Sequence, residues 1–267
     1  MRIAHIILPD ATEYERKSQR ADQAVLGPTH EILVTSAAEA QGSGAEVAHV
    51  YAGEALPPEP FVGFAIPYVS SAALARPRWR LRKAAAPAVT VTPENVPEVV
   101  EDRYFANLPP RSMPREGELR TVGSFGRGAT RNLVEQTMAR IHRFRDDVTW
   151  RELDAPPTPE DLASVDLWVD PAVEERDYDG FVAEALVVGV PVVAARTGVN
   201  AKRLEQGRTG TLVPLRDPNE LTHAILASLF KAEVATSKIS AAAQTVSKFR
   251  ARQRIRVLLH MYETLIR

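Results

Sequence analysis

The residues from 179 to 218 constrain the fold of this chain more than any other segment. They read in order as an apolar helix with Glu184 near its start, a strand over Val190–Ala195, a glycine turn, a short helix, a second glycine turn and a further strand. A strand that is apolar on both faces is typical of a parallel sheet covered by helices on each side. The segment therefore predicts an α/β fold in which it forms one side of a nucleotide-binding crevice.

The alternation of strand and helix extends on both sides of this segment. In the second half we expect strands at 119–125, 147–153 and 166–171 and helices at 132–143, 158–164, 181–188, 218–231 and 247–266. In the first half we expect strands at 1–9, 30–36, 45–53, 61–70 and 88–94 and a helix at 13–25. Alternating strands and helices indicate parallel βαβ units, and in the first half strands outnumber helices.

The length of 267 residues is sufficient for two domains of modest size. A proline-rich polar stretch over 108–114 is typical of a linker between domains. We expect a Rossmann-like domain at 1–110 and a second one at 111–235. A helical segment is expected at 236–267, and it could pack against the amino-terminal domain.

Composition and short motifs exclude several classes of function. A net charge of −1 gives no general attraction to nucleic acid or to an anionic membrane. The absence of cysteine excludes disulfides, thiolate metal sites and a cysteine nucleophile. The histidines form no ligand pair, and neither a hydrolase serine elbow nor a phosphate-binding P-loop motif is present. Because the apolar start at 3–8 is too short for a signal peptide and no apolar run could span a bilayer, we expect a cytoplasmic protein.

Two loops form the candidate site, because ligands of open parallel sheets bind beyond the carboxyl ends of the strands. The loop 174–180 leads into the helix that carries Glu184, so backbone amides near Gly180 and Phe181 could receive phosphate oxygens at a positive helix end.

The second loop is a glycine-rich turn after the strand 119–125. It contains Gly126, Arg127 and Gly128, and Arg131 follows four residues after Arg127. A guanidinium group at this position could pair with a diphosphate.

Each of these features also has a purely structural interpretation. Glu184 fits a solvated first-turn residue that interacts favourably with the helix dipole. The glycines fit turn formers, and Arg127 and Arg131 fit solvated surface residues. The basic run Arg76–Lys83 fits either a solvated segment or a contact to a phosphate-bearing acceptor or a membrane surface.

Two histidines in expected strands, His5 and His49, are interpreted in the same way. We expect them to be packed in the interior. A role in proton transfer or acceptor orientation would require either ring to lie at the crevice.

The span Val165–Leu226 resembles the carboxyl-terminal half of the glycosyltransferase family 4 group, which are retaining enzymes of the GT-B architecture. The matching features are Glu184–Leu186, Gly189–Ala194, Gly198, Gly207, Gly210–Pro214 and Asp217–Pro218. The resemblance implies an α/β, GT-B-like fold with two Rossmann-like domains facing a cleft. The amino-terminal domain, small and strand-rich, would lie on the acceptor side.

In this family two glutamates are separated by seven residues, and the second one holds the ribose hydroxyls of the nucleotide. The resemblance assigns this second glutamate to Glu184. Counting back eight positions gives Arg176, flanked by Glu175 and Asp177, where the family has the glutamate that contacts the donor sugar. A gapped alignment places Asp179 there instead, with a loop three residues shorter. The catalytic residues therefore stay unknown.

The leading hypothesis is a hexosyl- or other glycosyltransferase that binds a nucleotide diphosphate sugar between the two domains and transfers the sugar with retention to an unknown acceptor. Side chains and a helix end would neutralise the diphosphate, so no metal and no cofactor are expected. The expected donor-binding residues are Glu184, Arg127, Arg131, Gly180, Phe181 and Gly126. The alternatives are a catalytically inactive glycosyltransferase-like binding or assembly module and an epimerase or hydrolase of nucleotide sugars. Oligomer formation is left open.

Overall fold

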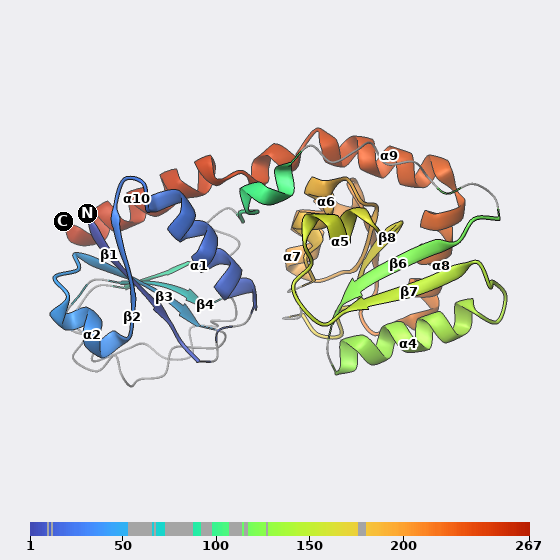
Figure 1. Cartoon of the computed structure of the whole chain (residues 1–267), viewed down its shortest axis with the longest axis horizontal. Helices are drawn as coiled ribbons and strands as arrows, with labels where there is room; N and C mark the ends of the chain where they lie inside the picture. The colour runs from blue at the N-terminus through green and yellow to red at the C-terminus, as the bar shows by residue number, and fades with distance from the viewer. Residues whose placement is uncertain are drawn as a thin grey trace. The chain divides into compact units, whose positions relative to one another are not determined.

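The computed structural model describes residues 1–9, 11, 13–52, 66, 68–72, 88–91, 98–106, 114, 117–126, 128–175 and 180–267. The chain divides into two compact units (Figure 1). Unit 1 comprises Met1–Val99 together with Lys248–Arg267, and unit 2 comprises Val100–Ser247. The basic run Arg76–Lys83 lies outside the described residues. The linker expected at 108–114 also lies outside them, except for Pro114.

Unit 1 contains a parallel sheet in the order β2-β1-β3-β4-β5. The strands are β1 (Arg2–Ile7), β2 (Glu31–Thr35), β3 (Val47–Ala52), β4 (Tyr68–Ala72) and β5 (Ala88–Val91). The helices are α1 (Glu13–Leu26), α2 (Ala37–Gly42) and α10 (Ala251–Ile266), the last preceded by the 3-10 turn η3 (Val246–Phe249).

The alternation of side chains along β1 builds the two apolar layers of unit 1. Ala4 and Ile6 face α2, where they pack with Ala40 and Val50. Ile3 lies on the opposite face in a cluster with residues of α1 and α10. The helix from the end of the chain therefore forms part of the core of unit 1.

A buried ion pair joins α1 to α10 within unit 1. Arg254 donates from Nε and Nη2 to the two carboxylate oxygens of Asp22, at 2.5 and 2.8 Å. The Tyr51 hydroxyl on β3 donates to the same carboxylate at 3.0 Å. All three side chains are buried, so the charges are compensated by one another and by hydrogen bonds rather than by water.

Two buried histidines complete this polar network. His49 Nδ1 lies 2.6 Å from the Tyr262 hydroxyl of α10, and its ring stacks on Tyr51 with 4.2 Å between centroids. The His5 ring, on β1, meets the His49 ring edge to face. Both histidines are inaccessible to solvent, which confirms that they are packed in the interior.

The stability of unit 1 is expected to fall as the pH drops from about 6.5 towards 4. Burial lowers the pKa of His5 from 6.5 to about 4, against the opposing influence of Asp22. The unfolded chain then takes up a proton before the folded one, so the contribution of neutral His5 is complete above pH 6.5 and is lost through this window. Urea unfolding between pH 4 and 8 would measure it. A His5→Gln variant with the parent's pH dependence would contradict the assignment.

Unit 2 contains the second parallel sheet, in the order β10-β9-β8-β6-β7. Its strands are β6 (Arg120–Phe125), β7 (Val148–Leu153), β8 (Leu167–Asp170), β9 (Val192–Ala195) and β10 (Thr211–Val213). Its helices are α4 (Ala129–Ile141), α5 (Pro159–Ala163), α6 (Val182–Val188), α7 (Gly198–Arg203), α8 (Pro218–Phe230) and α9 (Ala232–Ala243), with 3-10 turns η1 (Asp102–Phe105) and η2 (Glu205–Gly207).

The main core of unit 2 lies between its sheet and helices α4 and α8. Val122, Leu167, Val169 and Val193 form the sheet side of this core. Helix α8 begins at Pro218, as expected, because the Asp217 side chain accepts the amide hydrogens of the first turn.

The expected α/β class with Rossmann-like parallel sheets is confirmed, and the differences concern the bounds of individual elements and helix α2, which was not predicted. Helix α4 begins at Ala129 rather than at 132, because Gly128 takes a positive φ of 55° that ends the preceding turn. The last helix begins at Ala251 rather than at 247, because Arg250 has an extended backbone. Helix α9 lies partly within the helical segment expected at 236–267. No described helix is long and apolar enough to cross a membrane.

Candidate functional site

The chain order of unit 2 reverses at β6 and β8, which lie side by side in the sheet although β7 separates them in sequence. In open α/β sheets, ligands bind at such a switch point, outside the carboxyl ends of the strands. The loops that follow β6 and β8 are the two loops that the sequence predicts as the site. Phe125, at the end of β6, and Phe181, after β8, meet with perpendicular rings 5.1 Å apart. The fold therefore brings the two predicted loops together.

Glu184 lies in the first turn of α6, and its side chain is fully buried. The interpretation as a solvated surface residue is therefore wrong. Because the amino-terminal end of a helix carries partial positive charge, the position favours a carboxylate.

Gly180 lies against the end of β8. A Cβ atom added to it would lie 2.3 Å from both Cγ and Oδ1 of Asp170, so no larger residue fits. Its carbonyl oxygen accepts a hydrogen bond of 2.6 Å from Trp168 Nε1. The following residue, Phe181, is buried and adopts the left-handed conformation (φ 55°, ψ 32°) that leads into α6. The backbone before Glu184 is thus fixed by contacts with β8.

The glycine-rich turn after β6 shapes the start of α4. A Cβ atom at Gly126 would lie 2.7 Å from the Thr130 hydroxyl oxygen, which requires glycine or a shift of that side chain. Gly128 precedes α4 and gives it no side-chain cap. Arg127, the first of the two cations predicted for the diphosphate, lies outside the described residues.

Arg131 lies in the first turn of α4 and forms ion pairs with two carboxylates. Its Nε donates to Glu135 at 3.1 Å, and its Nη2 lies 3.0 Å from Glu152 on β7. The hydrogen bond to Glu135, followed by the charge of Glu152, raises the pKa of Arg131. Desolvation raises the pKa of Glu152 even though Arg131 opposes it. A diphosphate would have to compete with both carboxylates for this guanidinium.

A buried polar network at the same edge of the sheet was missed by the sequence reasoning. Asn200 in α7 donates from Nδ2 to Asp170 at 2.6 Å and to the carbonyl of Ala195 at 3.1 Å. Arg203 donates to the Asn200 side-chain oxygen at 3.1 Å. Asp170, Asn200 and Arg203 are all buried. The network connects the carboxyl ends of β8 and β9. In the sequence, the feature that indicates it is the carboxylate of Asp170 at the end of an apolar strand.

Glu175 also contributes to this edge, from the loop after β8. Its carboxylate accepts the backbone amide hydrogen of Gly198 at the start of α7. Arg176, Asp177 and Asp179, which the sequence places at or beside the expected sugar-contacting position, lie outside the described residues.

Comparison with known proteins identifies the part of the chain that carries these features. Residues 105–230 match the family Glycosyl transferases group 1. This Glycosyl transferases group 1 region extends from η1 to the end of α8 and contains every described site residue named above. No curated protein matches the chain in sequence.

Solved structures resemble the whole chain. A glycosyltransferase from Rickettsia africae has a TM-score of 0.67 and 12% identity, covering 100% of this chain and 98% of that one. Anabaena HepE, solved with UDP-glucose, has a TM-score of 0.67 and 13% identity, covering 98% and 100%. Sucrose-phosphate synthase from Thermosynechococcus elongatus has a TM-score of 0.62 and 13% identity, covering 99% of each chain. The chain therefore has the GT-B-like fold that these proteins share.

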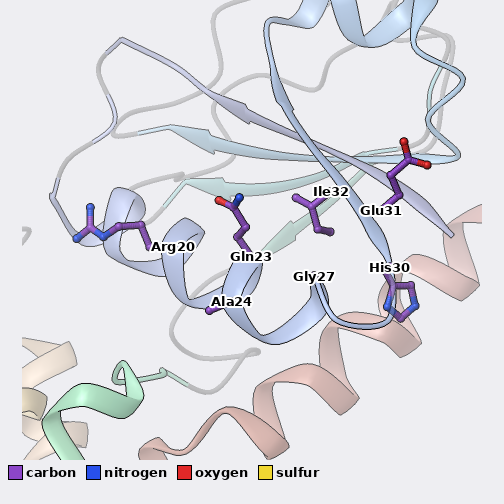
Figure 2. Close-up of a pocket in the computed structure, with 7 residues that line it drawn as sticks. All are labelled: Arg20, Gln23, Ala24, Gly27, His30, Glu31 and Ile32. Atoms are coloured by element: carbon purple, nitrogen blue, oxygen red, sulfur yellow. The ribbon is translucent and has the colours of Figure 1, made fainter.

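A hollow of about 630 Å³ lies on unit 1 and is formed by residues outside the Glycosyl transferases group 1 region (Figure 2). It lies between the second half of α1 and the start of β2, and it is lined by Arg20, Gln23, Ala24, Gly27, His30, Glu31 and Ile32. Because these residues lie at the amino-terminal end of β2, the hollow is at the opposite edge of the sheet from the usual ligand position. We assign it no role. Among the described residues, no group of three or more histidines and carboxylates could hold a metal ion.

Proposed function

We propose that the protein is a retaining glycosyltransferase that binds a nucleotide diphosphate sugar at the β6–β8 switch point of unit 2 and transfers the sugar to an acceptor. The observation that carries the proposal is the buried carboxylate of Glu184 at the start of α6, inside the region that matches Glycosyl transferases group 1. Burying a carboxylate is costly, and a fold retains one more readily where it has a use.

The chemistry of the switch point suits a nucleotide diphosphate sugar. A carboxylate accepts hydrogen bonds from both hydroxyls of a ribose, and such charge-assisted bonds are among the stronger ones in proteins. Arg131 and Arg127 supply positive charge for the diphosphate, and the backbone at Gly180 and Phe181 approaches phosphate or sugar. Charge compensation of this kind does not require a metal.

The burial of Glu184 adds a condition to this proposal. Since its side chain has no contact with solvent, a ribose reaches it only when the groups that cover it are displaced. Donor binding should therefore include a local rearrangement at the start of α6. Because HepE was solved with UDP-glucose, UDP-glucose is the first donor to test.

Glu184→Ala is expected to weaken binding of the donor about tenfold to a hundredfold, because a hydrogen bond to a charged group contributes roughly 1.5–3 kcal/mol. Titration calorimetry with UDP-glucose and a panel of other nucleotide sugars would measure the change, and circular dichroism would verify folding. Glu220→Ala is the matched control, since Glu220 is an exposed glutamate in the first turn of α8. Equal affinity of the parent and Glu184→Ala would exclude the ribose role.

A catalytically inactive binding or assembly module is the second candidate, and the two ion pairs of Arg131 favour it. A guanidinium already held by Glu135 and Glu152 is a weaker partner for phosphate than an uncommitted one. Release of nucleoside diphosphate from any donor, measured with and without added sugar acceptors, would eliminate this candidate. Failure of the whole panel to bind would eliminate the transferase instead.

A further inference from the structure

The outward face of α10 carries a row of cationic side chains. Arg252, Arg256 and His260 are exposed, and their spacing of four residues places them on one side of the helix; the exposed Arg267 directly follows the last helical residue, Ile266. Glu263 is the carboxylate on this side. We call these four residues the α10 stripe.

The arginines of the α10 stripe differ from most of the exposed arginines that the structure describes. In the described part of the chain, none of the stripe's four residues has an ion pair or a side-chain hydrogen bond. Elsewhere, five exposed arginines and two partly exposed ones are each held by a carboxylate: Arg103, Arg131, Arg151, Arg208 and Arg216, with Arg2 and Arg145. Local charge is therefore balanced at those seven positions and unbalanced along α10, although the net charge of the chain is only −1.

Apolar side chains border the α10 stripe along one side. Ile255 and Leu259 are half-buried, and Ile266 is 43% exposed. The opposite side of the helix is anchored, since Arg254 binds Asp22 and Leu258 packs in the core. The helix is thus fixed on unit 1 with its basic side facing outward, and the adjoining apolar margin consists of Ile266 and the exposed parts of Ile255 and Leu259, which also pack against the core.

This combination fits an anionic lipid surface better than other polyanions. The helix runs about 21 Å from Arg252 to Ile266, the residue before Arg267, so the stripe matches an extended array of charges rather than one small anion. A row of cations beside an apolar margin is the pattern of helices that lie in a membrane interface. Nucleic acid would bind the cationic side chains but has no apolar layer that could accommodate Ile266. We propose that unit 1 docks on bilayers containing anionic phospholipid through the outward face of α10.

The test is co-sedimentation of the full-length protein with vesicles of phosphatidylglycerol and phosphatidylcholine at low salt. Binding is expected with the mixed vesicles and not with phosphatidylcholine alone, and it should weaken as salt is raised. Arg252→Gln/Arg256→Gln should weaken binding about 25-fold, since each arginine near an anionic surface contributes roughly fivefold.

Arg143→Gln/Arg208→Gln is the control, because it removes the same charge from exposed positions on unit 2. Thermal melts of both variants should match that of the parent. Unchanged melting would show that weaker vesicle binding does not result from unfolding. An equal effect of the two double variants would overturn the proposal, as would binding to phosphatidylcholine alone. So would binding to duplex DNA without binding to the vesicles.

Discussion

Arg254→Met is expected to lower the free energy of unfolding of unit 1 by about 3–5 kcal/mol, the usual cost of removing one partner from a buried ion pair. The variant leaves the Asp22 carboxylate buried without its guanidinium, and only the Tyr51 hydroxyl still donates to it among the hydrogen bonds described above. Because the pair joins α1 to α10, the same change should loosen the final helix.

Two further variants separate loss of charge balance from loss of packing. Asp22→Asn/Arg254→Met removes both charges and keeps an acceptor for Tyr51, so it should recover a large part of the lost stability. Arg252→Met changes an exposed neighbour on the same helix and should behave like the parent. Denaturant unfolding monitored by circular dichroism, with hydrogen exchange of α10, would measure all three. An unchanged melt for Arg254→Met would contradict the assigned importance of the pair.

Gly180→Ala is expected to destabilise unit 2 by about 1–3 kcal/mol or more, the typical cost of overpacking. The new methyl group would lie 2.3 Å from Cγ and Oδ1 of Asp170, well inside contact distance. Asp170 cannot simply rotate away, since Asn200 donates to it within the buried network. The backbone before Glu184 must shift instead, so donor affinity should fall together with stability.

Calorimetric melting and titration with UDP-glucose would show whether stability and affinity fall together. Gly42→Ala provides the comparison, because Gly42 lies in the last turn of α2 with nothing near its Cβ position. That change should be neutral or slightly stabilising. A Gly180→Ala protein with normal melting and normal donor affinity would show that the close approach to Asp170 has no consequence.

The fold could be predicted largely from the sequence because unit 2 repeats a strong local signal. Buried strands such as Val192–Ala195 are apolar throughout and are bounded by glycine or proline, so their pattern indicates a parallel sheet without tertiary information. Helix α9 was expected only as part of the helical segment at 236–267, because its alanine-rich sequence has a weak amphipathic pattern that does not define its ends. The order of the strands, which creates the β6–β8 switch point, depends on contacts between distant segments.

The site could be predicted only in part. Residue type and the family resemblance singled out Glu184, but its complete burial depends on packing that a sequence does not display. The pairing of Arg131 with Glu152 joins a helix to a neighbouring strand 21 positions later, and no local pattern indicates it. Asn200 resembled an ordinary polar residue of a short helix, although it bridges the ends of two strands. Polar contacts between elements were thus the hardest features to foresee.

The position of α10 in unit 1 has a consequence for synthesis on the ribosome. Asp22 and Arg254 are 232 residues apart in sequence, so at roughly 5–20 residues per second Asp22 is made about 10–50 s before its partner. Unit 2 lies between them in sequence and can fold during this interval. The face of unit 1 that α10 covers meanwhile stays open, and the nascent chain offers an apolar surface to chaperones until α10 has been translated.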